Sequence, residues 1–235
     1  MITVVTGASS GLGEALARRL AARGDTVVAI ARSRERLEAL ARAQPGIVPI
    51  AADIADRAAV ETAVARVEAE VGPIGALVNN AAVFAMQPLQ DQQPAEIEAQ
   101  IATNLLGTIW ITRAVVPHLL RRRSGRIVMV ASVAGIRGIP GQSVYCASKH
   151  GMLGFADALA QELLPHGVLV SSLCPGAIDT PLWSHAPGDG GVPYPGDLGQ
   201  ALPLGEACAL VEFLLDRPPG TVCKRLIAFP TNEWH

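Results

Sequence analysis

The sequence predicts an α/β fold in which helices cover both faces of one doubly wound, seven-stranded parallel sheet. Short apolar runs typical of strands alternate along the whole chain with longer runs of helical periodicity. The run 127–131 is apolar at every position, as expected of a strand that is buried on both faces. Three glycines join the first strand to the first helix. With 235 residues, half of them hydrophobic, the chain suits one domain, 1–235, with a sizeable core.

The elements follow from this alternation, taken in chain order. Strands are expected near 2–6, 26–31, 47–51, 75–79, 126–131, 168–173 and 225–229. Helices are expected near 11–23, 33–43, 56–71, 94–122, 143–164 and 205–216. Pro117 is expected to kink the fourth helix or to end it early. Right-handed crossovers then place the ends of the first, fourth and fifth strands around one crevice, where ligands bind in such folds.

One long stretch, 175–203, has no periodicity and is rich in proline and glycine. Long irregular segments in compact domains are usually lids or disordered. The segment is therefore expected to be a lid or to be disordered. It contains no cluster of charges, which favours a small neutral substrate.

The turn after the first strand has the spacing Gly7-x3-Gly11-x-Gly13 and leads directly into a helix. Such a turn lets backbone N–H groups approach a pyrophosphate, while the positive end of the helix dipole faces it. The alternative is a tight turn without a ligand. At the end of the second strand, where an NAD site is expected to carry an acid, the chain has Arg32. A guanidinium binds a 2′-phosphate well, so Arg32 favours NADP(H) over NAD(H). Alternatively, Arg32 begins a solvated helix.

Tyr145 and Lys149 lie four residues apart on a predicted helix, so their side chains share one face. Only two of the 19 basic residues are lysines, Lys149 and Lys224, which suggests that position 149 needs an ammonium. A neighbouring cation is expected to lower the pKa of the Tyr145 phenol and make it a usable proton donor and acceptor. The alternative is a packed tyrosine beside a surface lysine.

Composition excludes several other classes of protein. The formal net charge of −2 gives no reason to expect binding to nucleic acid or to an anionic membrane. No apolar run is long enough to span a bilayer, and the first strand begins at residue 2, which leaves no room for a signal peptide. The four cysteines have no metal-site spacing. We therefore expect a cytoplasmic protein with reduced thiols and no metal.

Taken together, these motifs resemble those of the short-chain dehydrogenase/reductase family, in its single-domain branch with a Rossmann fold. The resemblance covers nearly the whole chain. Two departures are Ala82, where the family's Asn-Asn-Ala-Gly motif has glycine, and a C-terminus without the usual Asp-Gly-Gly. The matching motif residues are Thr6, Gly7, Gly11, Gly13, Asp53, Asn79, Asn80, Ala81, Asn104, Ser132, Tyr145, Lys149, Pro175, Gly176 and Thr180.

The resemblance implies a cofactor site and a catalytic site. The implied cofactor residues are Gly7, Ser9, Ser10, Gly11, Leu12, Gly13, Arg32, Asp53, Ile54, Asn80, Ala81, Tyr145, Lys149, Pro175, Gly176, Ile178 and Thr180. The implied catalytic residues are Tyr145 as general acid and base, Ser132 as hydrogen-bond donor to the substrate oxygen, Lys149 as partner of the tyrosine and of the ribose, and Asn104 as holder of a water that relays protons. The resemblance also implies that the segment 175–203 is a lid that covers the substrate, so Leu182, Trp183 and His185 are candidates for the substrate pocket.

The function that this resemblance implies is hydride transfer between NADP(H) and a small carbonyl or alcohol, as in dehydrogenases and reductases that act on CH–OH groups. Family members usually assemble through their two long helices, so a homodimer or homotetramer is expected. The rival hypothesis is a noncatalytic dinucleotide-binding sensor or regulatory protein with the same fold. Such a protein would have no need to retain all four catalytic side chains. A sugar-nucleotide epimerase normally needs a further substrate domain, for which this chain has little room.

Overall fold

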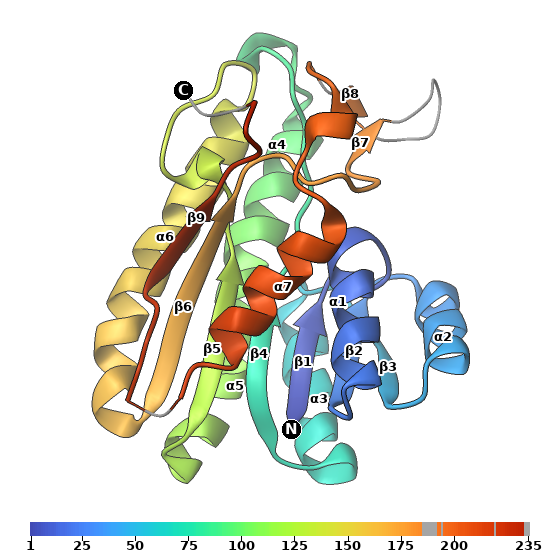
Figure 1. Cartoon of the computed structure of the whole chain (residues 1–235), viewed down its shortest axis with the longest axis vertical. Coiled ribbons are helices and arrows are strands. Elements are labelled where there is room, and N and C mark those ends of the chain that lie inside the picture. The colour runs from blue at the N-terminus through green and yellow to red at the C-terminus, as the bar shows by residue number, and fades with distance from the viewer. Residues whose placement is uncertain (185–191, 194, 219, 233–235) are drawn as a thin grey trace.

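A computed structural model describes residues 1–184, 192–193, 195–218 and 220–232. Its centre is a seven-stranded sheet with strand order β3-β2-β1-β4-β5-β6-β9, in which every neighbouring pair is parallel. The order reverses between β1 and β4, which makes the sheet doubly wound. Helices cover both faces (Figure 1). The predicted fold class is therefore confirmed.

The strands lie close to the predicted ranges. They are β1 (Ile2–Thr6), β2 (Thr26–Ala31), β3 (Ile47–Ala51), β4 (Ile74–Asn79), β5 (Gly125–Val130), β6 (Val168–Pro175), β7 (Trp183–Ser184), β8 (Val192–Pro193) and β9 (Arg225–Ala228). The α-helices are α1 (Gly11–Ala22), α2 (Arg34–Ala43), α3 (Arg57–Arg66), α4 (Pro94–Ile101), α5 (Thr108–Arg122), α6 (Ser143–Leu163) and α7 (Leu204–Leu215). The short pair β7 and β8 was not predicted and forms a separate two-stranded sheet.

Two apolar clusters fill the space between the sheet and its helices, one on each face. Along β5, Ile127 and Met129 belong to one cluster, whereas Val128 and Val130 belong to the other. This division follows the alternation of side chains along a strand. It explains why the run 127–131 is apolar at every position.

The predicted fourth helix, 94–122, consists of three parts. Between α4 and α5 lies a π-helical turn, η3 (Ala102–Gly107). Pro117 does not end α5, because the helix continues to Arg122. Pro117 also lies outside the π-helical turn η3. Pro117 lies on the exposed side of the helix, where water can replace the hydrogen bond that proline cannot donate. Of the two expected effects of Pro117, an early end of the helix is therefore wrong, and a kink stays a prediction.

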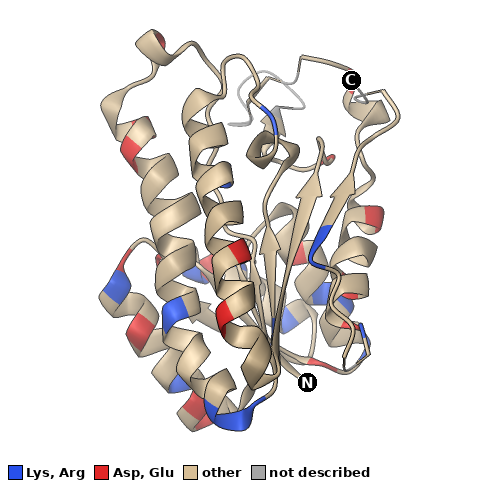
Figure 2. Ribbon diagram, turned by 90° about the vertical axis from the view of Figure 1, so that its left-hand side faces the viewer, with Lys and Arg blue, Asp and Glu red and all other residues tan. Residues whose placement is uncertain are grey.

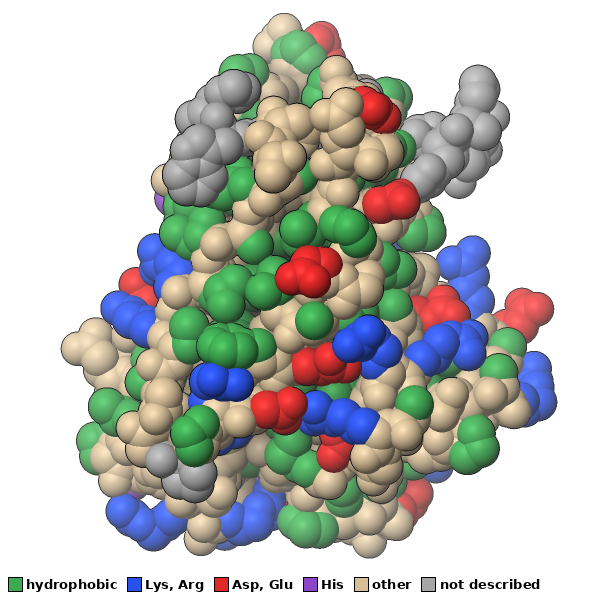
Figure 3. All heavy atoms as spheres, in the orientation of Figure 1, with side chains coloured by type: hydrophobic (Ala, Val, Ile, Leu, Met, Phe, Trp, Pro, Cys, Tyr) green, Lys and Arg blue, Asp and Glu red, His purple; other side chains and the backbone are tan. Residues whose placement is uncertain are grey.

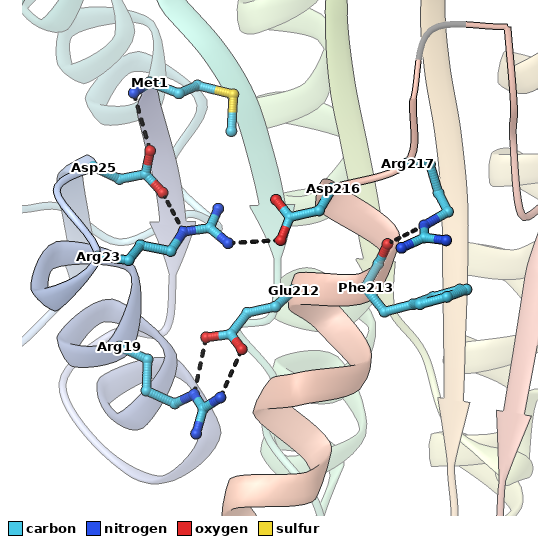
Figure 4. Close-up of polar contacts among 8 residues, drawn as sticks. All are labelled: Met1, Arg19, Arg23, Asp25, Glu212, Phe213, Asp216 and Arg217. Carbon is cyan, nitrogen blue, oxygen red and sulfur yellow. Dashed lines mark hydrogen bonds and ion pairs between the residues drawn. The ribbon is translucent and has the colours of Figure 1, made fainter.

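Ion pairs join α1 to α7 on one face of the molecule. Arg19 binds Glu212 through two hydrogen bonds of 2.9 and 2.7 Å, and Arg23 bridges Asp216 and Asp25 at 2.8 and 2.6 Å (Figure 4). The Met1 ammonium donates to Asp25 at 3.0 Å. Acidic and basic side chains are interspersed on this face (Figure 3). Among the helices of the described residues, none is long and apolar enough to cross a membrane.

Candidate active site

A cavity of about 1000 Å³ opens at the carboxyl ends of the sheet strands. Its lining includes residues that lie one or two positions after the ends of five neighbouring strands: Asp53 after β3, Arg32 after β2, Gly7 after β1, Asn80 after β4 and Ser132 after β5. The cavity therefore extends across the point where the strand order reverses. Parallel α/β sheets bind their ligands at this place.

The glycine turn between β1 and α1 forms one wall of the cavity. Gly7 has φ +67° and Gly11 has φ +54°, in the left-handed region that favours glycine. A Cβ atom on Gly7 would lie 2.7 Å from the Cα of Ala81. Gly13 does not line the cavity: a Cβ atom there would lie 2.3 Å from the carbonyl oxygen of Gly7. Gly13 thus lets α1 pack closely against the turn.

Hydrogen bonds hold the loop after β4 against the end of β1. The backbone N–H groups of Asn80 and Ala81 both donate to Thr6 Oγ1 at 3.0 Å. Asn80 Nδ2 donates to the Thr6 carbonyl at 2.9 Å. The Thr6 hydroxyl in turn donates to the Val78 carbonyl at 3.3 Å. The motif residues Thr6 and Asn80 therefore fix the two loops that border the cavity at its centre.

Arg32 lines the cavity at the end of β2, together with Ser33 and Arg36. Ser33 is the N-cap of α2, and its hydroxyl accepts a hydrogen bond from the Arg36 backbone at 3.3 Å. Arg36 therefore belongs to the first turn of this helix, where the dipole favours anions. The sequence pointed to Arg32 as the discriminating residue and left Arg36 without a role.

Ser132, Tyr145 and Lys149 line the same cavity on its other side. Ser132 directly precedes a 3₁₀ turn, and its hydroxyl accepts a hydrogen bond from the Ala134 backbone at 3.1 Å. Tyr145 and Lys149 are both buried on α6. The Lys149 ammonium donates to the Val130 carbonyl at 3.0 Å and lies 5.6 Å from the centroid of the Tyr145 ring. Tyr145 and Lys149 share one face of α6, as predicted, and therefore lie close together.

Burial dominates the acid–base properties of this pair. It raises the pKa of Tyr145 above its ordinary value, and a hydrogen bond with Ser132 opposes this change. Burial also lowers the pKa of Lys149 to about 8. The expectation that Lys149 lowers the pKa of Tyr145 is therefore not met in this structure. Removal from water sets the direction of the pKa change of Tyr145, and the Lys149 ammonium binds a strand carbonyl.

Asn104 lies in the π-helical turn η3 and is fully buried. Its Oδ1 accepts a hydrogen bond from the Val83 backbone at 2.8 Å, and its Nδ2 donates to the Val83 carbonyl at 2.9 Å and to Ser148 Oγ at 3.1 Å. Asn104 itself does not line the cavity. The structure therefore shows its side chain supporting the loop after β4, and the expected water relay stays a prediction.

Aromatic side chains border the cavity next to Tyr145. The Phe84 ring packs edge-on against Tyr145, with centroids 4.8 Å apart, and edge-on against Trp183 at 5.1 Å. Trp183 is buried and Leu182 is exposed, and both line the cavity as expected. His185 lies outside the described residues.

Sequence reasoning missed Phe84 and also Arg137, which lines the cavity as well. Neither residue belongs to a motif. The available signal was position: Phe84 is two residues beyond the motif 79–82, and Arg137 is five beyond Ser132.

Apart from Gly13, every predicted cofactor residue lines this one cavity. The set comprises Gly7, Ser9, Ser10, Gly11, Leu12, Arg32, Asp53, Ile54, Asn80, Ala81, Tyr145, Lys149, Pro175, Gly176, Ile178 and Thr180. No group of three or more potential metal ligands occurs among the residues that the structure describes.

Comparisons with known proteins agree with this arrangement. The model of the short chain dehydrogenase family matches residues 1–189. The chain is 37% identical over 190 residues to 3-oxoacyl-(acyl-carrier-protein) reductase FabG of Thermotoga maritima, covering 79% of this chain and 77% of that protein. It is 36% identical over 189 residues to 2-(R)-hydroxypropyl-CoM dehydrogenase of Xanthobacter autotrophicus, covering 77% and 76%.

Among solved structures, the closed form of a serine dehydrogenase complexed with NADP⁺ is similar to this chain, with a TM-score of 0.88 and 31% identity. The similarity covers 100% of this chain and 97% of that one. Sequence, topology and the residues that line the cavity thus lead to one assignment. The chain belongs to the short-chain dehydrogenase family of oxidoreductases.

Proposed function

We propose that this protein is an NADP(H)-dependent oxidoreductase that interconverts a carbonyl and a primary or secondary alcohol, with Tyr145 as general acid and base. One observation carries the proposal: Ser132, Tyr145 and Lys149 line the same cavity as the glycine turn and Arg32. A hydride donor and a proton donor can therefore reach one substrate. The complexes of related structures with NADP⁺ support the choice of cofactor.

The residues present fit such a dinucleotide. Gly7 and Gly11 have positive φ angles, which residues with side chains disfavour. Because these positions have no side chains, the N-terminus of α1 stays accessible to a pyrophosphate. Arg32 and Arg36 would bind the 2′-phosphate, with Asp53 and Ile54 beside the adenine. Pro175, Gly176, Ile178 and Thr180 would border the nicotinamide. When bound, the reduced cofactor supplies a hydride to the carbonyl carbon.

The chain's own groups control the proton. The Tyr145 hydroxyl donates its proton to the substrate oxygen during reduction and accepts one during oxidation. The Ser132 hydroxyl donates a hydrogen bond to the same oxygen and orients it. Burial raises the pKa of the phenol, which favours its protonated form, the form that donates in reduction. Asn104 supports the loop after β4 that holds Asn80 and Ala81.

The segment 175–203 is proposed to cover the substrate. Its described residues that line the cavity include Leu182, Trp183 and Pro195, beyond the part proposed to border the nicotinamide. Phe84 joins this segment to Tyr145, because it packs against both Trp183 and the catalytic ring.

Replacement of Tyr145 tests the catalytic proposal directly. Tyr145→Phe removes one hydroxyl and keeps the ring that packs against Phe84. We expect kcat for a panel of aldehydes and ketones to fall by at least about 100-fold, because the hydroxyl acts in the transition state. The Kd of NADPH, measured by cofactor fluorescence, should change little. An unchanged kcat would disprove the role of Tyr145. Tight NADPH binding by the wild type without turnover of any compound would favour a sensor.

Replacement of Arg32 tests the cofactor preference. Arg32→Ala is expected to weaken NADPH binding by at least about tenfold and to leave NADH binding nearly unchanged, because only NADPH carries the 2′-phosphate. Arg34→Ala is the matched control: Arg34 is an exposed neighbour on α2 that faces Glu38 and does not line the cavity. Equal losses for the two cofactors would indicate that Arg32 has a packing role.

A further inference from the structure

Gln142 is a polar side chain that lines the cavity together with Tyr145 and that the proposed mechanism does not use. It is only 7% exposed. Gln142 is the N-cap residue of α6, and its backbone carbonyl accepts a hydrogen bond from the Cys146 N–H at 2.7 Å. Its side chain makes no capping hydrogen bond. The side-chain amide is therefore not occupied in starting the helix.

The protein satisfies this amide only weakly. Its Nε2 donates to Met86 Sδ at 3.6 Å, and a thioether sulfur is a weak acceptor. The side-chain oxygen of Gln142, Oε1, accepts no hydrogen bond from the part of the chain that the structure describes. A buried polar atom without a partner costs free energy, and gaining a partner recovers it. A ligand that donates a hydrogen bond to Oε1 would supply that partner.

Helix geometry places Gln142 one turn from Tyr145, on the side away from Lys149. The three residues follow one another at spacings of three and four, so they lie along one face of α6, and all three line the cavity. Lys149 is expected to contact the ribose of the cofactor, and Tyr145 the reacting oxygen. Side chains one turn apart have Cβ atoms about 5 to 6 Å from each other. The Gln142 amide is therefore within reach of a group on the carbon next to the reacting carbonyl.

Backbone hydrogen bonds fix the turn that carries Gln142. The Gln87 N–H, in the loop after β4, donates to the Gly141 carbonyl at 2.8 Å, and the Gln142 N–H donates to the Ile139 carbonyl at 3.0 Å. Gly141 has φ +77°, in the left-handed region that favours glycine. The amide is thus held by a fixed turn. A binding group that is already in position loses little entropy when the ligand arrives.

We propose that Gln142 Oε1 accepts a hydrogen bond from a hydroxyl group beside the reacting carbonyl, so that the enzyme interconverts α-hydroxy ketones and vicinal diols. This inference rests on the proposed function and adds a substrate class to it. The second hydroxyl takes no part in the reaction: the hydride goes to the carbonyl carbon, and Tyr145 gives its proton to the carbonyl oxygen. A protonated amine is also a donor. However, the one acid in the described lining, Asp53, follows β3, on the side where the adenosine would bind.

Ketones that differ only beside the carbonyl test this proposal. The probes, assayed with NADPH, are racemic acetoin, its methyl ether, and methyl isopropyl ketone, in which a methyl group replaces the hydroxyl. The ether keeps the electron-withdrawing oxygen but cannot donate a hydrogen bond. We expect the wild-type kcat/KM for acetoin to exceed that for each analogue by about tenfold or more, because both analogues leave Gln142 Oε1 without a donor.

Replacement of Gln142 connects the preference to this amide. Gln142→Met keeps the length of the side chain and removes both polar atoms. The ratio of kcat/KM for acetoin to that for methyl isopropyl ketone should fall to within about twofold of one. Gln161→Met is the matched control and should keep the wild-type ratio, since Gln161 is exposed on the same helix and donates to the Asp157 carbonyl. Gln142→Leu makes the same test if Gln142→Met does not fold.

Oxidation gives a second comparison that does not depend on how electrophilic a ketone is. With NADP⁺, the probes are propylene glycol and sec-butanol, in which a methyl group replaces the second hydroxyl. We expect kcat/KM for oxidation of the secondary alcohol to be about tenfold or more higher for propylene glycol. This preference should also disappear in Gln142→Met.

Several outcomes would overturn the inference. They are equal turnover of acetoin and its two analogues by the wild type, and a preference for acetoin or propylene glycol that persists in a folded Gln142→Met. Equal losses on all probes in that variant also overturn it, because they indicate a structural role. Turnover of methyl isopropyl ketone without preference for acetoin overturns this inference and leaves the proposed oxidoreductase in place. No turnover of any probe despite bound NADPH overturns both.

Discussion

Lys149 is the side chain whose burial affects both stability and chemistry most directly. It is 1% exposed, and burial lowers its pKa from 10.5 to about 8. A difference of this size corresponds to about 3 kcal/mol by which the folded protein disfavours the charged amine. The ammonium keeps one hydrogen-bond partner, the Val130 carbonyl. The catalytic site is therefore maintained at the expense of stability.

Replacing this lysine with an apolar side chain of similar length should stabilise the fold. At pH 7 the amine is protonated in both the folded and the unfolded protein, so the full cost is present. Between pH 8 and 10.5 the unfolded chain binds more protons at this lysine than the folded protein does. The free energy of unfolding of the wild type therefore rises with pH in this range. We expect Lys149→Met to gain about 2 kcal/mol at pH 7, and the gain to shrink toward pH 10. Urea denaturation of both proteins from pH 7 to pH 10 measures this difference.

The chain contains its own control for this experiment, since Lys224 is the only other lysine. Lys224 is exposed and faces Asp157 at 3.5 Å. Lys224→Met should therefore give no gain that varies with pH. A Lys149→Met protein that is less stable than the wild type at pH 7 would contradict the burial argument. Other titrating groups are common to both proteins and cancel in the comparison.

Part of this chemistry was predictable from the residues alone. The spacing of Tyr145 and Lys149 correctly predicted that they share a helix face. Their pKa values did not follow from the spacing, because these depend on burial against β5 and on the Val130 carbonyl. Arg137 and Phe84 were missed for a similar reason: tertiary packing, which no local pattern encodes, brings them to the cavity.

Among the elements, the π-helical turn η3 connects the helical layer to the loop after β4. It carries Asn104, which makes hydrogen bonds to both backbone groups of Val83. Helical periodicity predicted the outer limits of this region, 94–122, with good accuracy. It could not predict the π turn, because the apolar pattern continues through it. The element was thus identified, but the irregularity that places Asn104 was not.

Loss of the Asn104 side chain should loosen the loop and leave the helix in place. Asn104→Ala removes the partners of the Val83 N–H and carbonyl, and we expect a loss of about 2 to 3 kcal/mol in the free energy of unfolding. The amide of Val83 should lose protection in hydrogen exchange. Thr112→Val is a control on α5, because Thr112 binds Asn79 at 2.9 Å and should not affect Val83. Unchanged protection of Val83 would show that Asn104 does not hold this loop.

At the scale of the whole molecule, the alternation of elements and the handedness of the crossovers predicted the sheet and the position of the cavity. These features depend on the entire chain and tolerate errors of a few residues in any element. Ala82, the departure from the family motif at 79–82, lies in the lining of the cavity.

The outer faces of α5 and α6 supply a surface for the expected homo-oligomer. In Figure 2, the helices that face the viewer are largely uncharged in their upper halves, and charged residues gather lower down. Small residues recur on the exposed side of α6 at Ala147, Gly154 and Ala158, and Leu106 of η3 is 41% exposed. Small side chains let two helices approach closely, and an exposed leucine gains from being covered.

We therefore expect the wild type to elute in size-exclusion chromatography with light scattering at two or four times the mass of one chain. Ala158→Arg places a long side chain on the exposed small-residue side of α6 and should shift the protein toward the monomer at micromolar concentration. Ala65→Arg, on the exposed side of α3, adds the same charge elsewhere and should leave the mass unchanged. Circular dichroism of both variants distinguishes dissociation from unfolding. A monomeric wild type would contradict the expected oligomer. An unchanged mass for a folded Ala158→Arg would place the interface on another surface, because burying a long charged side chain at a close helix contact is costly.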